Sequence, residues 1–430
     1  MTKIYHSALE TLDNIKSGDN IWCHSMAATP YKMLEALAVR AMSLESLTLM
    51  HLHLENAGAV CTPELDGHLR NRCYFVGKET RSLVNEGRAD YVPMFLSEIP
   101  RLFRQRLQPI DVALIQVSPP DRHGNCSLGV SVEVTRAACD VADTIIAQIN
   151  PRMPRTHGDA TIKYKDIDFA VEIDSPLPIY SNPEVDAINQ RIGQHVAGLI
   201  EDGNCLQTGI GAIPDAALAC LSDRKHLGIH TEMFSNGVPP LVEAGVIDNS
   251  KKTISPGKLV TGFALGERAL YDFVDDNTNT LFLDIEYVNN PAVIRKNSQV
   301  VSINSALQID LTGQVCADSI GNRIYSGFGG QVDFVTGAQL SEGGRSIIAL
   351  PSTAVGGTVS RIVNDLAAGA GVVTTRAQVD HVVTEYGVAS LRGRSIQERA
   401  KALIEIAHPD FQESLSQEFN QGLNPGARTS

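Results

Sequence analysis

The chain has 430 residues, which is more than one hydrophobic core usually holds, since domains average about 150 residues. Its composition, with 43% hydrophobic and 20% charged residues, is that of a globular protein and excludes a largely disordered chain. The formal net charge of -13 argues against nonspecific binding to nucleic acid or to an anionic membrane, so local turns, helix N-termini or a few arginines would have to hold any anionic ligand.

The N-terminal segment has a helical pattern and not that of a targeting sequence. Leu9, Leu12 and Ile15 recur at helical spacing among polar residues, without the continuous apolar stretch of a signal peptide. No later segment approaches the about 20 apolar residues of a membrane span. The eight cysteines are scattered and include no C-x-x-C pair, which indicates reduced thiols. We therefore expect a cytoplasmic protein without a metal site.

Short β-rich runs alternate with helical patterns along the chain. They predict β-α-β units and an α/β fold with mostly parallel sheets, and they lie at 47–54, 112–118, 143–149, 205–209, 226–231, 281–288, 346–351 and 381–387. Three prolines within 172–186 predict a boundary there between two related open α/β domains, 1–180 and 181–430. Ser181 or Asn182 is the expected cap of the next helix, with Pro183 in its first turn.

Two segments repeat the same order of features. One starts at Gly18 and the other at Gly203, and each runs from a glycine through a short strand, a small-residue turn, a proline and a helix to another strand. These later strands end near Glu55 and Glu232, and a glycine follows each. The repeat indicates a duplication, in which case equivalent turns of the two halves face a shared cleft.

Two glycine-rich segments are candidates for ligand contact. The turn at 207–211 joins a strand to a helix, so its backbone N–H groups could hold an anion, and the alternative is an ordinary tight turn. The run at 327–330 allows main-chain amides to approach a substrate, as an oxyanion hole requires, and the alternative is a hairpin or bulge. Asp121, His123 and Cys126 lie close together, but their segment is more typical of consecutive turns than of a metal or nucleophile site.

Three carboxylates, Glu55, Glu232 and Glu385, stand at predicted strand ends, where open α/β sheets bind ligands. Glu232 is favoured because the turn at 207–211 precedes it by one helix in a single β-α-β unit. The alternative for each carboxylate is to cap the following helix or turn.

Several longer segments resemble one family. The segments are "INPRMPRTHGD", "SPPDRHGNCSLGVSVE", "GIGAIPDA", "HTEMFSNG", "YVNNP", "SINSALQIDLTGQV", "GFGGQVDF" and "VDHVVTEYGVASLRGRSIQERAKALIEIAHPDF". Together they are similar to the acetyl-CoA hydrolase/transferase family, and within it to the branch of 4-hydroxybutyrate and butyrate:acetate CoA-transferases. The resemblance runs from the first strand-to-helix turn to about Phe411.

The resemblance implies a homodimer or higher homo-oligomer that binds acyl-CoA in an interdomain cleft, with CoA as substrate and no prosthetic group. The implied reaction moves CoA between 4-hydroxybutyryl-CoA or butyryl-CoA and acetate, and the alternative is acyl-CoA hydrolysis through the same intermediate. The family's catalytic glutamate matches Glu232, and an asparagine that orients it matches Asn289, with Asn290 as the adjacent alternative. The family's CoA-contacting positions match Gln207, Thr208, Gly209, Ile210, Gly211, Leu307, Gly330 and Thr353.

A carboxylate nucleophile suits this chemistry. Its attack on an acyl-CoA gives a mixed anhydride and CoA thiolate, which then attacks the glutamyl carbonyl to form a glutamyl-CoA thioester in a ping-pong cycle. Each step passes through an oxyanion, for which Gly327, Gly329 and the Asn289 side chain are candidate donors. We expect Glu232 to be ionised without an unusual pKa. Arg392 and Arg394 are candidates for phosphate contact, with ordinary surface arginines as the alternative.

Overall fold

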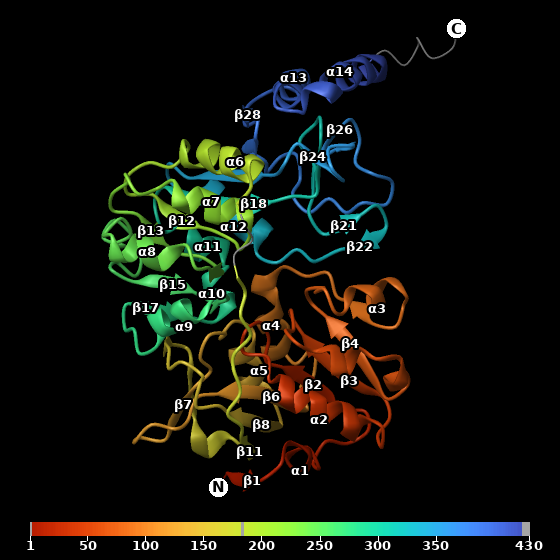
Figure 1. Ribbon diagram of the computed structural model, residues 1–430, viewed down its shortest axis with the longest axis vertical. Helices are drawn as coiled ribbons and strands as arrows, with labels where there is room; N and C mark the ends of the chain where they lie inside the picture. Colours follow the sequence, from red (N-terminus) through yellow and green to blue (C-terminus); the bar gives the residue numbers. More distant parts are fainter. Residues whose placement is uncertain (1, 182–184, 424–430) are drawn as a thin grey trace.

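The first half of the chain forms an eight-stranded sheet (Figure 1) in the computed structural model, which describes residues 2–181 and 185–423. Every strand is parallel to its neighbours, in the order β1 (Lys3–Tyr5), β11 (Phe169–Glu172), β8 (Thr144–Ile149), β6 (Val112–Val117), β2 (Asn20–Cys23), β3 (Leu47–His51), β4 (Leu69–Cys73) and β5 (Asp90–Tyr91). All residues of β6 are buried, because a central parallel strand is covered on both faces.

Short helices connect these strands. They are α1 (Ala8–Thr11), α2 (Tyr31–Ala41), η1 (Gly58–Cys61), η2 (Pro63–Leu65), α3 (Arg81–Asn85), η3 (Leu96–Glu98), α4 (Ile99–Arg104), α5 (Thr135–Val141) and η4 (Tyr164–Asp166), where η marks a 3-10 helix. A two-stranded sheet pairs β7 (Asn125–Ser127) with β10 (Thr161–Lys163).

The second half forms a six-stranded sheet. Its order is β13 (Gly228–Ile229), β12 (Cys205–Gln207), β18 (Val300–Ser305), β23 (Arg345–Ala349), β27 (His381–Thr384) and β28 (Gly387–Ser390), and only the last pair is antiparallel. Its longer helices are α6 (Ala187–Ala197), α7 (Ala212–Ala219), α12 (Gln331–Leu340), α13 (Ile396–Glu405) and α14 (Pro409–Leu423). Figure 1 shows α13 and α14 extending beyond the rest of this half at the C-terminal end.

Smaller elements surround the second sheet. The shorter helices are α8 (Val238–Glu243), α9 (Arg268–Val274), α10 (Ile285–Val288) and α11 (Pro291–Ile294). The remaining strands are β9 (His157–Gly158), β14 (Met233–Phe234), β15 (Leu259–Thr261), β16 (Phe263–Ala264), β17 (Thr280–Phe282), β19 (Gln308–Asp310), β20 (Val315–Cys316), β21 (Ser319–Ile320), β22 (Arg323–Ile324), β24 (Thr353–Ala354), β25 (Val359–Ser360) and β26 (Ile362–Val363). Strand β9 of the first half pairs with β17 of the second, so the halves share a small sheet.

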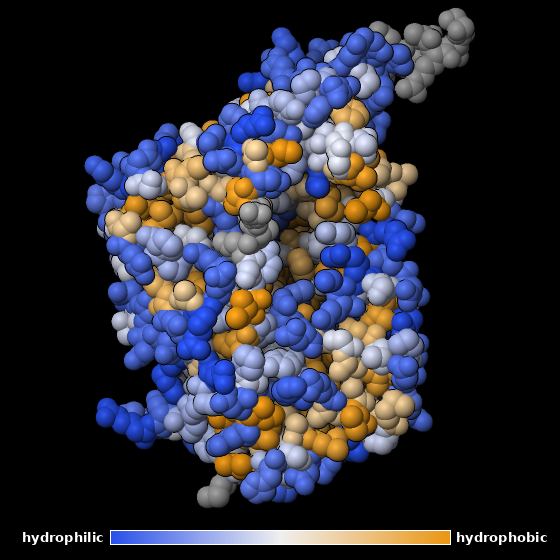
Figure 2. All heavy atoms as spheres, viewed as in Figure 1, coloured by the Kyte–Doolittle hydropathy of each residue, from blue (hydrophilic) through white to orange (hydrophobic). Residues whose placement is uncertain are grey.

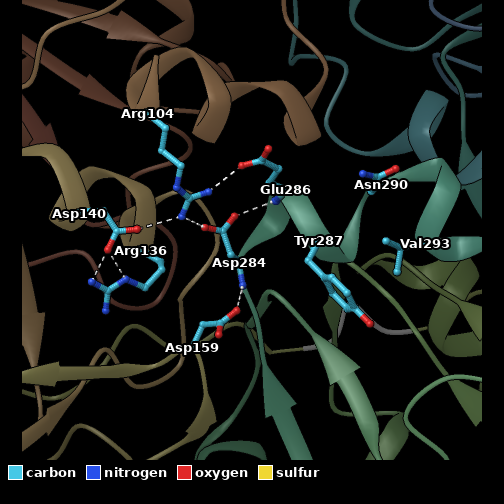
Figure 3. Close-up of a pocket in the computed structure, with 9 residues that line it drawn as sticks. All are labelled: Arg104, Arg136, Asp140, Asp159, Asp284, Glu286, Tyr287, Asn290 and Val293. Carbon is cyan, nitrogen blue, oxygen red and sulfur yellow. Dashed lines mark hydrogen bonds and ion pairs between the residues drawn. The ribbon is translucent and has the colours of Figure 1, made fainter. Parts of the chain in front are cut away.

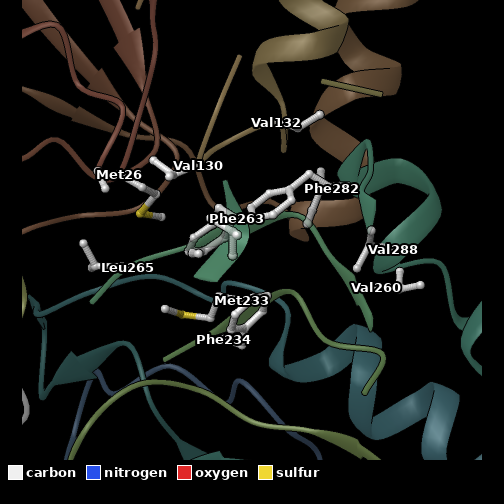
Figure 4. Close-up of a cluster of buried hydrophobic side chains, with 14 of the residues drawn as sticks. Met26, Val130, Val132, Met233, Phe234, Val260, Phe263, Leu265, Phe282 and Val288 are labelled. Carbon is white, nitrogen blue, oxygen red and sulfur yellow. The ribbon is translucent and has the colours of Figure 1, made fainter. Parts of the chain in front are cut away.

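A hydrophobic core joins the two halves. Figure 4 shows Met26, Val130 and Val132 of the first half beside Met233, Phe234, Phe263 and Phe282 of the second, and all are buried. Figure 2 shows a mainly hydrophilic surface on one face, hollowed near its centre where the halves meet. The core therefore holds the segment that follows Glu232 against the first half.

The structure confirms the predicted α/β fold with mostly parallel sheets. The two segments with similar sequence patterns fold alike, because β2, α2 and β3 form a parallel β-α-β unit, as do β12, α7 and β13. The boundary between residues 180 and 181 stays a prediction. No helix within 2–181 or 185–423 is long and apolar enough to cross a membrane.

Two local predictions were wrong. The run 281–288 was expected to be one strand, but β17 ends at Phe282 and Ile285–Val288 is helical, because Asp284 caps that turn by accepting the Glu286 amide at 2.8 Å. Helix α6 begins at Ala187 and is capped by Asp186, which accepts the Asn189 amide at 2.7 Å, and not by Ser181. The expected cap Asn182 and first-turn Pro183 lie outside the described residues.

Candidate active site

Glu232 lies in the connection between β13 and β14, where its main chain is held firmly. Its carbonyl oxygen accepts hydrogen bonds from the Gly262 amide at 2.8 Å, the Phe263 amide at 3.1 Å and the Thr261 hydroxyl at 3.1 Å. These donors belong to β15, β16 and the residue between them. The partly buried side chain therefore starts from a fixed backbone.

The Glu232 carboxylate meets Asn289 and the glycine run. Asn289 Nδ2 donates to Glu232 Oε2 at 2.9 Å, and the Gly330 main chain also hydrogen-bonds this carboxylate. A Cβ at Gly330 would stand only 2.0 Å from Oε2, so glycine is required for this approach. A Cβ at Gly329 would lie 3.8 Å from Oε1. Asn290 has another task, since its side chain caps α11 by accepting the Ala292 amide at 2.9 Å.

Gly327 lies slightly apart from this group. A Cβ there would stand 3.1 Å from Phe75 Cδ2 of the first half. First-half residues also hold the neighbouring carbonyls, because the Val76 amide donates to Ser326 at 3.2 Å and the Leu96 amide donates to Gly329 at 3.3 Å. The first half of the chain thus supports the glycine run that reaches Glu232.

Burial changes the expected acidity of the carboxylate. Removal from water raises the pKa of Glu232 to about 7, and the hydrogen bonds from Asn289 and Gly330 limit the rise. The sequence had led us to expect an ordinary pKa, because nothing in the local pattern reports how deeply the side chain lies. Near neutral pH a large fraction of Glu232 is protonated.

The two residues before Glu232 connect it to other parts of the site. Buried His230 donates from Nε2 to the Val288 carbonyl at 2.8 Å, immediately before Asn289. Burial lowers the pKa of His230 to about 3, so the ring stays neutral. The Thr231 hydroxyl accepts the Thr208 amide at 3.2 Å and donates to the Thr208 carbonyl at 2.9 Å. Sequence reasoning missed both roles, and the only available signal was adjacency to Glu232.

The turn at 207–211 presents open backbone at the start of α7. A Cβ atom added at Gly209 or at Gly211 would meet no other atom within 4 Å. Gly211 has a φ of +118°, which favours glycine. The Gln207 side chain is buried and donates to the Ile303 carbonyl at 3.3 Å. Ile210 is partly buried between the two glycines. The turn is thus connected to Glu232 through Thr231 and leaves room for a ligand.

Leu307 and Thr353 are brought near each other by Arg361. Its guanidinium donates to the Thr353 carbonyl at 3.3 Å and to the carbonyl of Ala306, next to Leu307, at 3.3 Å. Arg361 is partly buried, which lowers its pKa, and it has no ion pair within the described part of the chain. No motif had pointed to this cation. Arg392 and Arg394 lie exposed in the turn between β28 and α13, and their phosphate role stays a prediction.

The other candidate carboxylates have structural partners. Glu385 accepts the Ser352 amide at 2.9 Å and the Ser352 hydroxyl at 2.6 Å, as a cap does. Glu55 pairs with His53 at 2.8 Å. Asp121 Oδ1 accepts the His123 amide at 2.8 Å and the Asn125 amide at 2.9 Å, which confirms a turn. Among residues 2–181 and 185–423, no three His, Cys, Asp or Glu side chains group as metal ligands would.

A mainly apolar pocket opens beside Glu232. The pocket is small, with a volume of about 10 Å3 and so room for about one water molecule, and its lining carries no cationic side chain. The lining residues are Met26, Leu52, Tyr74, Phe75, Met94, Leu96 and Ile99 of the first half, with Glu232 and Gly329 of the second. The two halves therefore build this site together.

A more open pocket lies beside α10 and does not include Glu232 (Figure 3). Its charged groups are paired with one another, because Arg104 binds Asp140 at 3.0 Å, Glu286 at 2.6 Å and also Asp284. Asp284 caps the first turn of α10, and Asn289 ends that helix. This network therefore anchors the element that carries Asn289, and we assign it no ligand.

Known proteins resemble the chain over nearly its whole length. The acetyl-CoA hydrolase/transferase N-terminal domain matches residues 2–180, and the C-terminal domain of the same name matches 266–419. A 4-hydroxybutyrate coenzyme A transferase of Clostridium kluyveri is 50% identical and covers 93% of both chains. A succinyl-CoA:acetate/propanoyl-CoA:succinate CoA transferase of Fasciola hepatica is 49% identical over 94% of this chain and 85% of its own. The crystal structure of RipA from Yersinia pestis has a TM-score of 0.92 at 37% identity, covering 96% of both chains.

Proposed function

Because the chain belongs to the acetyl-CoA hydrolase/transferase family and is a CoA-transferase, we propose that it moves CoA between a short-chain acyl-CoA and acetate through a thioester on Glu232. The proposed donors are 4-hydroxybutyryl-CoA and butyryl-CoA. The observation that carries the proposal is the Glu232 carboxylate, bonded to Asn289 and Gly330 beside an apolar pocket. Asn289, Gly327 and Gly329 are the proposed partners of Glu232 in the catalytic group.

The proposed reaction needs only the carboxylate, the thioester and the acid. Ionised Glu232 attacks the acyl carbonyl, the C–S bond breaks, and CoA leaves as a thiolate from a mixed anhydride. The thiolate attacks the glutamyl carbonyl, and the bond between the glutamyl carbon and the bridging oxygen breaks, so the acyl group leaves as a carboxylate. Acetate then attacks the glutamyl-CoA thioester, and the same steps in reverse give acetyl-CoA. No net proton is taken up or released.

Asn289 and Gly330 are placed to stabilise one of the oxyanions. Both already bond the Glu232 carboxylate, so the oxygen that gains negative charge when the thiolate attacks the glutamyl carbon meets donors that need no rearrangement. Loss of one such donor costs about 3 to 4 kcal/mol in a protease that stabilises a tetrahedral oxyanion. The Gly327–Gly330 run is the proposed source of donors for the other oxyanion, on the acyl carbon.

The apolar lining beside Glu232 is the proposed position of the acyl chain, and its side chains have to move apart to admit that chain, because the pocket holds only about 10 Å3. Burial of its methylene groups there is favourable by about 0.8 kcal/mol each. A donor with a second carboxylate would place that charge among Met26, Phe75 and Ile99 without a cation in the lining. This favours an uncharged acyl chain over a succinyl chain.

The CoA part is proposed to extend from Glu232 along the turn at 207–211. Thr231 connects that turn to the nucleophile, and Gly209 and Gly211 leave space beside the backbone. Leu307, Gly330 and Thr353 are the further proposed CoA contacts. CoA is a substrate in this proposal, which includes no prosthetic group.

The assembly and location belong to the same proposal. We propose a homodimer or a higher homo-oligomer in the cytoplasm, and domains at 1–180 and 181–430. The separate sheets, built from 3–172 and 205–390, support that division.

Transfer is distinguished from hydrolysis by the need for an acceptor. We expect the purified protein to convert butyryl-CoA and 4-hydroxybutyryl-CoA to acetyl-CoA only when acetate is added, as followed by chromatography of the CoA esters. Without acetate, loss of acyl-CoA should stop after about one equivalent of enzyme has reacted. Continuous loss at an equal rate without acetate would establish the hydrolase alternative, and a faster rate with succinyl-CoA would contradict the pocket argument.

A further inference from the structure

Asp333 is a second buried carboxyl group close to Glu232 that the proposed reaction does not use. It lies in the first turn of α12, three residues after Gly330, and is 4% exposed. Its Oδ1 accepts the Ser97 hydroxyl at 2.8 Å, and its Oδ2 accepts the Ser97 amide at 3.2 Å. Ser97 belongs to η3 in the first half, so Asp333 connects the two halves at the site.

Asn289 lies between the two carboxyl groups. Its side-chain nitrogen donates to Glu232 Oε2 at 2.9 Å, and the Asp333 carboxyl group lies close enough to interact with the same side chain. A carboxamide nitrogen carries two hydrogens, so Asn289 has one for each carboxylate. Within the described residues its Oδ1 is buried and has no hydrogen-bond partner. The orientation of the amide therefore depends on the acceptors of its nitrogen.

The alternative orientation of Asn289 is harmful to the reaction. A flipped amide would point its oxygen at the Glu232 carboxylate and remove a donor from the developing oxyanion. Glu232 alone accepts only one of the two hydrogens. If Asp333 accepts the second hydrogen, a flip of the amide breaks two hydrogen bonds. It also places the amide oxygen against the oxygens of both carboxyl groups, which repel it.

We propose that Asp333 is a positioning residue, which accepts the second N–H of Asn289 and so keeps the amide nitrogen directed at Glu232. This inference rests on the proposed nucleophilic role of Glu232. Ser97 holds Asp333 from the opposite side, and Gly330 places the start of α12 against the nucleophile. The first half of the chain thereby helps to orient a donor carried by the second.

The two carboxyl groups also influence each other electrostatically. The elements around the two carboxyl groups contribute neutral side chains, Ser97 from η3 and Asn289 from the α10–α11 connection, while Glu98 of η3 is exposed. The charged groups that face each other are therefore Glu232 and Asp333. Burial raises the pKa of both carboxyl groups to about 7, and the charge of Glu232 contributes to the rise at Asp333. Ionisation of one therefore opposes ionisation of the other.

The test is the pH profile of kcat/KM for butyryl-CoA in wild-type protein and in Asp333→Asn and Asp333→Ala. Activity requires ionised Glu232, so wild-type activity should fall below about pH 7. Removing the neighbouring charge should move this acid limb to lower pH in both variants. Loss of amide orientation should lower kcat about 10- to 100-fold with little change in KM. The loss of kcat should be smaller in Asp333→Asn, which keeps an acceptor oxygen, than in Asp333→Ala.

Asp310→Asn is the matched control, because Asp310 is also buried and accepts hydrogen bonds within its own turn, from Thr312 and Gln314. It should leave the acid limb in place. If Asp333 variants do not fold, Ser97→Ala replaces them. Without the Ser97 hydroxyl, Asp333 ionises less readily, so Glu232 ionises before it. The acid limb of the pH profile should again move to lower pH, by a smaller amount than in the Asp333 variants.

An unmoved acid limb with unchanged kcat in a folded Asp333 variant would overturn the inference. So would equal loss in Asp333→Asn and Asp333→Ala without any movement of the limb, since that is the result of a purely structural role. Failure of the proposed function has a different signature. In that case chemical trapping of the wild-type intermediate would modify a residue other than Glu232, whatever the pH profiles of the Asp333 variants.

Discussion

Replacing Glu232 by alanine should abolish CoA transfer and leave CoA binding intact. The alanine has no nucleophile to accept the acyl group, and Glu232 is the only carboxylate among the described residues that line the pocket. We expect kcat to fall by at least about 1,000-fold, as is usual when a covalent nucleophile is removed. Steady-state rates of acetyl-CoA formation measure the loss, and titration calorimetry with CoA measures binding.

Glu232→Gln should behave in the same way, because an amide keeps the shape of the side chain but not its nucleophilic charge. Glu243→Gln is the control, since Glu243 lies exposed on α8. Its activity should equal that of the wild type. Substantial activity in Glu232→Ala would remove this residue from the reaction, and loss of CoA binding in the same variant would indicate a general structural defect.

Gly330→Ala should be the second most damaging change. The added Cβ would stand 2.0 Å from Glu232 Oε2 and 2.3 Å from Asn289 Nδ2, so neither group could keep its position. The φ of Gly330 is -96°, which alanine adopts without strain, and the protein should therefore fold. We expect a loss of about 100- to 1,000-fold in kcat, which is the effect of displacing a nucleophile and an oxyanion donor.

Gly58→Ala is the matched control for this change. A Cβ at Gly58 would meet no atom within 4 Å, and the residue lies in η1, away from the pocket lining. Its rates and its thermal melting temperature should be those of the wild type. If Gly330→Ala retained more than about half of the wild-type kcat, the close contact between Gly330 and the carboxylate would not be needed for the reaction.

The fold was predictable where a local pattern fixes the environment. The run 112–117 is apolar except for Gln116, and the structure buries all of it in a parallel sheet. The run 281–288 was ambiguous, because a short apolar segment fits a strand or a buried helix equally well. Asp284 decided in favour of a helical turn, through a cap that composition alone does not reveal.

The site was predictable only in part. Glu232, Asn289 and Gly330 meet in the structure although they come from three separate segments, and their roles stay predictions. The pocket lining and Asp333 were not found from the sequence, because Met26, Phe75 and Ser97 approach the second half only through the packing of the two sheets. The raised pKa of Glu232 was missed for the same reason, since burial is a property of the folded chain.

The most direct test of the account is to trap the covalent intermediate. The wild-type protein is incubated with butyryl-CoA without any acceptor acid, treated with borohydride, digested and analysed by mass spectrometry. A glutamyl-CoA thioester at Glu232 would be reduced to the corresponding alcohol, and we predict this change at Glu232 alone. Reduction at Glu55 or Glu385, or no modified carboxylate in a sample that transfers CoA normally, would contradict the proposed mechanism.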